Sequence, residues 1–328
     1  MCRSLNEEVL VNIADFFARA IAVGMENDPR GIDAVRAELG RVRKEYDDLK
    51  PKEKELFDSD RLENPYADSR MLAGDGSLPL RTMLVGVDID LGELLLADRF
   101  RDRGVPVDLV FSHHPSGRAL ANLSAVMAMQ ADIISCAGVP INVAEGVLEG
   151  RISEIARRVL PINHTRVADA ARLLNMPLCC LHTPADNMVA SYLQKLFEEK
   201  KPYALDDVVE LMMEIPEYAD AAKINAGPRI FLGSKKRRTG KVFVDMTGGT
   251  EGAKEVFESL SLSGINTIVG MHLSEEHRKE AEKHHVNVVI AGHIASDNIG
   301  INLLLDKVMQ DEQITVLECS GFRRFPRG

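Results

Sequence analysis

The sequence predicts an α/β fold that follows a charged helical segment of about 75 residues. From about residue 81 to residue 317, short apolar runs typical of buried strands alternate with amphipathic runs typical of helices. Before this region the apolar residues show only helical spacing. Three of the predicted strands are followed directly by polar motifs that contain histidine. Ligands of open α/β sheets collect at the carboxyl ends of strands, so these motifs can meet in one crevice.

The N-terminal segment is predicted to form a helical hairpin or cap. Apolar residues from Val9 to Ile21 are spaced for one helix face, the turn-forming run 27–31 ends this helix, and a second amphipathic run covers 32–49. The segment has no histidine and no clustered polar signature. A packing or oligomerisation role is therefore favoured over a catalytic one.

The α/β region follows a loop rich in turn-forming residues. Its predicted strands are 83–88, 107–111, 178–181, 229–232, 241–245, 265–269, 286–291 and 314–317. Its predicted helices are 91–103, 119–134, 144–159, 164–174, 187–199, 251–262, 274–284 and 297–309, with two short ones in the charged interval 200–238. This alternation indicates helices that cover a largely parallel or mixed sheet. No internal repeat is apparent.

Composition limits the class of protein. A chain of 328 residues with 45% apolar content is long enough for one elaborate domain or two ordinary ones. The formal net charge of -10 argues against a protein that mainly coats nucleic acid, and the basic run 235–238 has no interleaved aromatic residues.

The sequence also predicts a cytoplasmic location without membrane contact. No run approaches the roughly 18 uninterrupted apolar residues of a membrane span, and the first eight residues lack the layout of a secretory signal. The five cysteines are an odd number and form no CxxC pair, so reduced core cysteines are expected.

The candidate chemistry lies in the three polar motifs. His113 and His114 leave a strand in a turn fixed by Pro115, so their imidazoles point in different directions, as two neighbouring metal ions would require. The alternative is that one or both are surface loop histidines. His293 and Asp297 stand four apart at the opening of a predicted helix, where such side chains share one face and can chelate an ion.

The middle motif leaves two interpretations open for each of its residues. His182 and Asp186 straddle Pro184 and are predicted not to share a helical turn. Asp186 either binds a metal ion or caps the following helix. His182 is either an outer-shell or proton-transfer group beside Asp186, or a satisfied core histidine. Histidine and carboxylate together are the ligand set of a catalytic metal centre.

A glycine-containing motif, 247–250, stands between a predicted strand and a predicted helix. Such a position can cradle a phosphate. The motif lacks the lysine of a Walker loop and the third glycine of a dinucleotide fingerprint. A tight strand-to-helix turn is therefore the favoured interpretation.

In these motifs the sequence resembles the Nif-three-like family, also called GTP cyclohydrolase I type 2 homologues. That family carries a His-His doublet after a strand, a His-x-x-x-Asp segment in mid-chain and a Gly-His-x-x-x-Glu segment near the C-terminus. The glycine motif at 247–249, Gly270 before 274–277, and the run 288–293 also follow the family's order. The resemblance covers roughly residues 81 to 317 and leaves the N-terminal 75 or so without a counterpart.

The resemblance implies a dinuclear metal site in a cleft between two α/β lobes with mixed sheets, in subunits that form a ring-shaped hexamer. The expected regions are an N-terminal helical extension (1–75), a first lobe that carries the ligands (76–199 with 286–328) and a second lobe (200–285). Carried over by position, the implied metal ligands are His113, His114, Asp186, His293 and Asp297. The chain departs from the family pattern twice, with Asp297 in place of Glu and with Val-Gly-Met at 269–271 in place of Thr-Gly-Glu.

The implied cofactors are two divalent ions from the group Zn, Fe, Mn, Ni and Co. Such a pair supports hydrolysis of a small or nucleotide-like substrate by metal-activated water, with His182 as the candidate catalytic group. The family label implies opening of the GTP ring, but no residue here selects guanine. The alternative is a metal-dependent binding or regulatory module without turnover. Expected partners are the substrate and further copies of this chain, and neither nucleic acid nor membrane.

Overall fold

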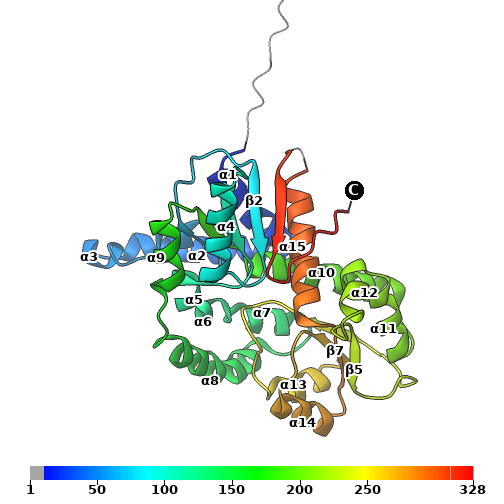
Figure 1. The fold of residues 1–328 in the computed structure, drawn as a ribbon. Helices are drawn as coiled ribbons and strands as arrows, with labels where there is room; N and C mark the ends of the chain where they lie inside the picture. Colours follow the sequence, from blue (N-terminus) through cyan, green and yellow to red (C-terminus); the bar gives the residue numbers. More distant parts are fainter. Residues whose placement is uncertain (1–10, 311, 328) are drawn as a thin grey trace, which may run out of the picture.

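The computed structural model describes residues 11–310 and 312–327, so Val9 and the first eight residues lie outside it. Within the described residues, nine strands form two sheets, and helices pack against both faces of each sheet (Figure 1). The predicted α/β class with two mixed sheets and an N-terminal helical region is confirmed. In the same part of the chain, no helix is both long enough and apolar enough to span a membrane.

The first sheet has five strands in the order β1-β4-β3-β2-β9. The strands are β1 (Arg70–Ala73), β2 (Thr82–Gly86), β3 (Leu109–Ser112), β4 (Leu178–Cys180) and β9 (Thr315–Cys319). All pairs are parallel except β1 with β4, which places an antiparallel strand at one edge. The central strands are buried on both faces, as is typical of parallel sheets covered by helices.

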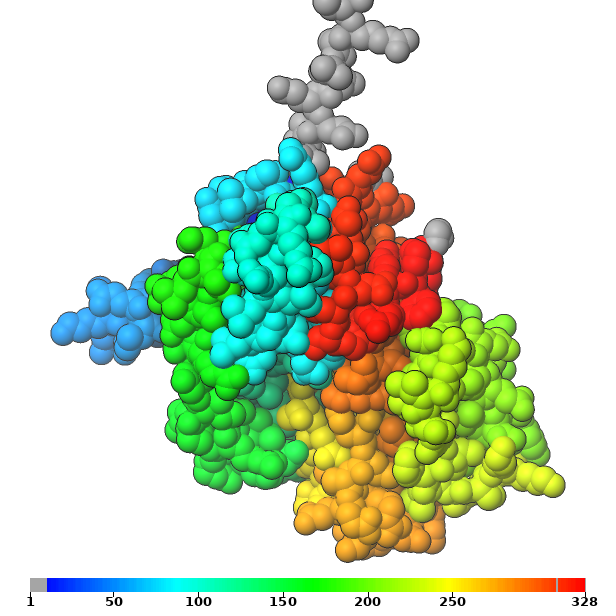
Figure 2. All heavy atoms as spheres, in the orientation of Figure 1, coloured from blue at the N-terminus to red at the C-terminus, as the bar shows by residue number. Residues whose placement is uncertain are grey.

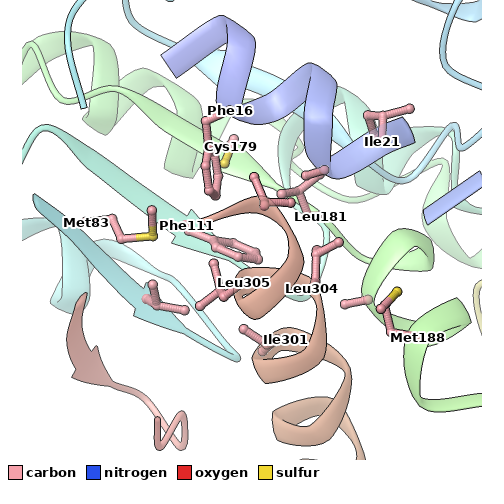
Figure 3. Close-up of a cluster of buried hydrophobic side chains, with 14 of the residues drawn as sticks. Phe16, Ile21, Met83, Phe111, Cys179, Leu181, Met188, Ile301, Leu304 and Leu305 are labelled. Atoms are coloured by element: carbon pink, nitrogen blue, oxygen red, sulfur yellow. The ribbon is translucent and has the colours of Figure 1, made fainter. Parts of the chain in front are cut away.

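Side chains of β2 alternate between two separate cores. Met83 and Val85 point into the larger core, which α1 (Ile13–Glu26), α10 (Thr183–Lys200) and α15 (His293–Val308) complete, whereas Leu84 points to α4 (Leu91–Asp102) and α9 (Thr165–Leu173). Figure 3 shows Phe16 of α1 beside Cys179, with Leu304 and Leu305 of α15 in the same cluster. The N-terminal helix is therefore part of the core of the first sheet.

The second sheet has four strands in the order β5-β8-β7-β6. The strands are β5 (Arg229–Leu232), β6 (Val242–Asp245), β7 (Thr267–Gly270) and β8 (Asn287–Ile290), and only the pair of β5 with β8 is antiparallel. One face packs on α10, α11 (Leu205–Met213), α12 (Pro216–Ala222) and α15. The other packs on α7 (Met129–Cys136), α8 (Ile141–Val159), α13 (Val256–Leu262) and α14 (Glu275–Lys283).

The two sheets share one design. In each, the first strand along the chain lies antiparallel at an edge, and the next three are parallel to one another. In each, the fourth strand leads into a helix that opens with His-x-x-x-Asp-Asn, at 182–187 for α10 and at 293–298 for α15. The prediction of no internal repeat is wrong for the structure. The connections conceal the repeat, because α5 to α9 separate β3 from β4, whereas only α14 separates β7 from β8.

Two strands lie outside the regions in which they were expected. β8 was expected in the first lobe but pairs with β5 and β7 in the second sheet, because the short crossover through α14 returns the chain beside β7. β1 was expected in the N-terminal extension but forms the edge of the first sheet. The chain returns to the first sheet through α15, whose side chains lie in both large cores. The domain boundaries themselves stay a prediction.

Several helix boundaries differ from the predicted ranges. The predicted helix 119–134 is divided into α5 (Gly117–Ala121), α6 (Leu123–Val126) and α7, because the Asn122 side chain donates a hydrogen bond to the Arg118 carbonyl and competes with the helix. The helices predicted from 187 and 297 begin four residues earlier, at the start of α10 and of α15. The helix predicted from 251 begins only at Val256.

The remaining N-terminal helices stand away from the sheets. They are α2 (Ile32–Asp48), α3 (Pro51–Lys54) and the 3-10 turn η1 (Ser59–Leu62). Only Val35 of α2 is buried. Figure 2 shows α2 and α3 as a projection from the body of the molecule. This segment differs from α1, which is packed into the core.

Candidate metal centre

The histidine doublet extends the ladder between β2 and β3. The main-chain N–H of His113 donates to Gly86 O and that of His114 to Val87 O, so the strand pairing continues through the doublet. The rings are tilted by 42° with centroids 5.1 Å apart. His113 is buried, with Nδ1 3.3 Å from Leu181 O, whereas Nδ1 of the partly exposed His114 lies 2.7 Å from an Asp88 oxygen. The alternative that both are surface loop histidines is therefore wrong, because His113 is buried.

The middle motif lies in the first turn of a helix. Proline lacks the N–H that a first turn leaves unpaired, so Pro184 is accommodated there and α10 begins at Thr183. His182 Nε2 lies 3.6 Å from an oxygen of Asp186, one turn later. The prediction that the two residues do not share a turn is wrong. Asp186 makes no capping hydrogen bond, and its buried Oδ1 has no hydrogen-bond partner, so the capping interpretation is also wrong.

The third motif opens α15, four residues before the predicted start of that helix. His293 is the first residue of the helix, and its Nε2 lies 3.5 Å from Oδ2 of Asp297. The preceding Gly292 has φ of 100°, and a Cβ there would stand 2.4 Å from Ala226 O. Only glycine fits this close approach, which aims the helix start at the doublet.

The three motifs meet at one place. Among the described residues, three groups of side chains have ligand atoms within 4.8 Å of one another: His113 with His114 and His182, His114 with His293 and Asp297, and His113 with Asp186 and Asp297. Asp297 Oδ1 lies 3.5 Å from His113 Nε2, whereas Oδ2 lies 3.5 Å from His114 Nε2. Each oxygen of Asp297 therefore faces a different histidine of the doublet.

Several buried atoms of this cluster lack a hydrogen-bond partner. Among the described residues they include His113 Nε2, Asp186 Oδ1 and both oxygens of Asp297. A buried polar group without a partner costs roughly 1–3 kcal/mol, and more when it is charged. Convergent imidazole nitrogens and carboxylate oxygens of this kind fit a divalent transition-metal ion. The cluster can therefore bind metal.

The pKa values of the cluster also support binding of a positive ion. Burial lowers the pKa of His113, but the carboxylates of Asp297 and Asp186 outweigh burial and raise this pKa to about 10. Burial, with the neighbouring His113 and His182, lowers the pKa of His114 to about 4. Burial raises the pKa of Asp297, yet the imidazoles outweigh it and hold that pKa below its ordinary value. The pocket therefore favours the ionised carboxylate of Asp297 with positive charge beside it.

Sequence reasoning missed a buried carboxylate that holds His182. Asp68 is fully buried and accepts hydrogen bonds from His182 Nδ1 at 2.9 Å, from Thr183 Oγ1 at 2.7 Å and from Ser69 Oγ at 3.2 Å. His182 is therefore buried with Nδ1 satisfied, as expected of a core histidine, while its Nε2 faces Asp186, so both interpretations stay open. Asp68 lies in the turn-rich segment before β1, where nothing in the sequence marks its distant partner.

Asp88 was also missed, and for His272 the sequence left a peripheral contact with the cleft without support. Asp88 contacts His114 as described above, and the ring of His272 lies 4.3 Å from that of His293 between centroids. His272 follows β7 as His114 follows β3, so the shared design of the two sheets was the signal that could have found it.

A cavity of about 280 Å³ opens beside the cluster. Its walls come from both lobes: the ends of β6 and β7, the turn after β3, and the starts of α10 and α15. Asp186, His293 and Asp297 line it, and so does His272. At about 280 Å³ the cavity lies just below the roughly 300–1,000 Å³ of typical ligand pockets, so it suits a small molecule.

No protein-family model matches the chain, and no curated protein matches it. A NIF3 superfamily protein from Sphaerobacter thermophilus is similar in structure, with a TM-score of 0.67 and 28% identity over 78% of this chain and 91% of that one. HcgD from Methanocaldococcus jannaschii, in a reduced form, gives a TM-score of 0.48 and 13% identity over 82% and 97% of the two chains. A Bacillus cereus protein related to NIF3 gives a TM-score of 0.37 and 12% identity over 77% of this chain and 91% of that one.

Proposed function

The chain belongs to the Nif-three-like family, and from this premise we propose that it is a dinuclear metal-dependent hydrolase of a small or nucleotide-like substrate. The observation that carries the proposal is the division of one carboxylate between two groups of ligands. Asp297 Oδ1 faces His113, which shares a ligand group with Asp186, and Oδ2 faces His114 and His293. A side chain shared in this way suits a pair of neighbouring ions.

The proposed ligands are the five side chains that meet at the cleft: His113, His114, Asp186, His293 and Asp297. When bound, two divalent ions supply Lewis-acid polarisation of the substrate and a water of lowered pKa. The metal is one of Zn, Fe, Mn, Ni or Co, because mixed imidazole and carboxylate donors suit this group.

His182 is the proposed proton-transfer group. Asp68 accepts a hydrogen bond from Nδ1, which fixes the ring and leaves Nε2 as the nitrogen that faces the site. The ring is buried and lies beside the doublet, with its centroid 4.9 Å from that of His113. A fixed imidazole at the edge of the cleft can hold or release a proton at one defined atom.

Elemental analysis of the purified protein tests the metal proposal. We expect two transition-metal ions per chain in the wild type and a clear loss in a His113→Ala, Asp186→Ala double variant. A His284→Ala variant is the matched control, because His284 lies at the end of α14 and does not line the cavity. Full metal content in the double variant would refute the proposed site.

A screen for turnover separates the hydrolase from a binding or regulatory module. The metal-loaded protein and its His293→Ala variant are assayed against phosphoesters and nucleotides, GTP included. We expect hydrolysis that the variant loses, because His293 contributes to the cluster and to the cavity wall. Equal residual activity in the two proteins would exclude the hydrolase and favour a binding or regulatory module.

We also propose that the chain forms a homo-oligomer, a ring-shaped hexamer by family resemblance, and that it is cytoplasmic. Six chains of 36.2 kDa give a particle of about 217 kDa. Light scattering during size-exclusion chromatography measures this mass directly. Cell fractionation tests the location. A stable single-chain mass at micromolar concentration would contradict the hexamer.

A further inference from the structure

The loop from Thr247 to Ala253 forms the wall of the cavity that faces the metal cluster. It connects Asp245 at the end of β6 to Val256 at the start of α13. Thr247, Gly249, Thr250 and Glu251 line the same cavity as Asp186 and Asp297. The loop is therefore placed to contact the part of a substrate that extends away from the metal cluster.

Side chains behind the loop hold its carbonyl oxygens. The buried Gln130 donates from Nε2 to both Gly248 O and Thr250 O, each at 2.7 Å. Arg151 Nε donates to Glu251 O at 3.1 Å. Three carbonyl oxygens of the loop are thus hydrogen-bonded to side chains of α7 and α8.

The start of the loop is held by a chain of buried polar groups. Thr247 Oγ1 donates to Asn187 Oδ1 at 2.6 Å, and Asn187 Nδ2 donates to Tyr66 OH at 3.1 Å. Tyr66 in turn donates to Asp28, just after α1. The loop is therefore fixed to the first lobe and to the N-terminal segment.

Two glycines bring the main chain of the loop against α6 and α7. Gly248 and Gly249 have φ of 96° and 93°. A Cβ at Gly248 would stand 2.7 Å from Gln130 Cγ, and one at Gly249 would stand 2.8 Å from Val126 Cγ1. Since no side chain fits behind Gly249 and none extends from it, the backbone itself forms this part of the cavity wall.

The main-chain N–H groups of this loop are without protein acceptors. Across the described residues, no hydrogen bond has the N–H of any residue from 247 to 253 as its donor. Backbone donors of folded proteins are paired with protein, water or ligand. Successive N–H groups in a loop with left-handed residues form a concavity that binds anions.

We propose that this loop binds an oxyanion of the substrate, a phosphate ester, while the histidine and aspartate cluster acts on another part of the molecule. This inference rests on the proposed function, because it assigns a substrate to the same cleft. The site is formed by the loop and not by a helix N-terminus, since α13 begins after it. It makes the substrate class a small phosphorylated compound.

Two carboxylates near the loop set its charge. Glu251 Oε1 accepts from the N–H of Ser274 at 3.1 Å and lies 3.4 Å from His277 Nδ1, so it is already engaged. Asp245 has no such partner among the described residues and lines the cavity two residues before Thr247. Its charge opposes that of a bound phosphate. Removal of this charge therefore offers a test by gain of affinity.

The test titrates inorganic phosphate into the full-length protein by isothermal calorimetry, after chelation and again after metal loading. The chelated wild type is expected to bind phosphate, because the loop needs no metal. Gln130→Leu is expected to bind it about tenfold more weakly, since two hydrogen bonds that hold the loop are lost. Gln194→Leu is the matched control, because Gln194 holds Val244 of β6 in a similar way but not the loop.

Asp245→Asn is expected to bind phosphate about threefold more tightly at low salt, with a smaller gain at high salt, because a like charge is removed. No phosphate binding by the chelated wild type, or binding that appears only after metal loading, would overturn the proposal. Equal affinities for Gln130→Leu and Gln194→Leu would overturn it too. Metal content measured on the same samples reports separately on the metal site, so the failure of one proposal is distinguishable from the failure of the other.

Discussion

At the scale of single residues, the two carboxylates of the cluster, Asp186 and Asp297, belong to different numbers of potential ligand groups. Asp186 belongs to one of the three ligand groups, whereas Asp297 belongs to two of them and is almost fully buried. Asp297 is also the position at which the chain departs from the glutamate of its family. The shorter side chain still reaches both sides, with 3.5 Å between its oxygens and each histidine of the doublet.

This difference between the carboxylates predicts two distinct losses of metal. Asp186→Asn removes charge from one ligand group and is expected to lose one of the two ions per chain. Asp297→Asn removes the shared carboxylate and is expected to lose both. Inductively coupled plasma mass spectrometry of both variants, prepared side by side, measures the two ratios. Equal metal content in the two variants would contradict the shared role of Asp297.

Asp68 predicts an effect on stability. Asp68→Ala leaves three buried donors, on His182, Thr183 and Ser69, without their acceptor, so we expect a loss of about 1–3 kcal/mol or more in the free energy of unfolding. Burial raises the pKa of Asp68, but these donors outweigh it and the net direction is downward. A carboxyl with a lowered pKa stabilises the fold above its unfolded pKa, near 3.9, and this stabilisation is lost on further acidification.

Urea denaturation at several pH values measures this effect. The wild type should lose part of its unfolding free energy below about pH 4, and Asp68→Ala should lose less over the same interval. Asp75→Ala is the control, since Asp75 is exposed and bonds only within its own turn. Parallel pH profiles for the wild type and Asp68→Ala would contradict the prediction.

The five side chains that meet in the cluster could be predicted from the sequence, whereas the residue that holds His182 could not. His113, His114, Asp186, His293 and Asp297 each follow a run with the signature of a buried strand, and strand ends of α/β sheets converge. Asp68 follows no such run, and its partner His182 stands 114 positions away. The sequence predicts that Pro184 separates His182 from Asp186, yet a proline in the first turn is compatible with a helix.

At the scale of elements, the site depends on the crossing of α10 and α15, which present the two His-x-x-x-Asp turns. Gly300 of α15 lies against α10, and a Cβ there would stand 2.4 Å from Ala185 O. Ala185 is adjacent to Asp186, so the distance between these helices also sets the distance between Asp186 and Asp297. Figure 1 shows the two helices together at the middle of the molecule.

Gly300→Ala is therefore expected to destabilise the fold by about 1–3 kcal/mol and to reduce metal content, because the added methyl forces the helices apart. Gly150→Ala in α8 is the matched control, because no atom lies within 4 Å of the added carbon. That variant should be neutral or stabilised by up to about 1 kcal/mol. Thermal and urea denaturation measure the stability of both variants, and elemental analysis measures their metal content. Equal stability and equal metal content in the two variants would contradict a role for close packing at Gly300.

At the scale of the whole molecule, the two lobes share their cores. Side chains of α10 and α15 lie in the large cores on both sheets, so neither core is complete without these helices. The N-terminal helix α1 is part of this arrangement, and its Phe16 is buried beside Cys179. The sequence predicted α1 as a helix but not its place in the core, because an amphipathic pattern shows which face is apolar and not which element covers it.

The shared helices predict that both lobes unfold together. Differential scanning calorimetry is expected to give one transition whose calorimetric enthalpy equals the van't Hoff enthalpy. Phe16→Ala should lower its midpoint through a loss of about 3–5 kcal/mol, while Leu56→Ala, at a side chain that is 90% exposed, should change it little. Two separate transitions would contradict a shared core.

The central claim is that side chains from three distant strand ends hold a pair of metal ions. A crystal structure of the metal-loaded protein, with anomalous scattering recorded at metal absorption edges, tests it most directly. The account predicts two peaks in the cleft, one among His113, Asp186 and Asp297 and one among His114, His293 and Asp297. A metal-loaded crystal with no peak among these side chains, or with its peaks elsewhere, would contradict the account.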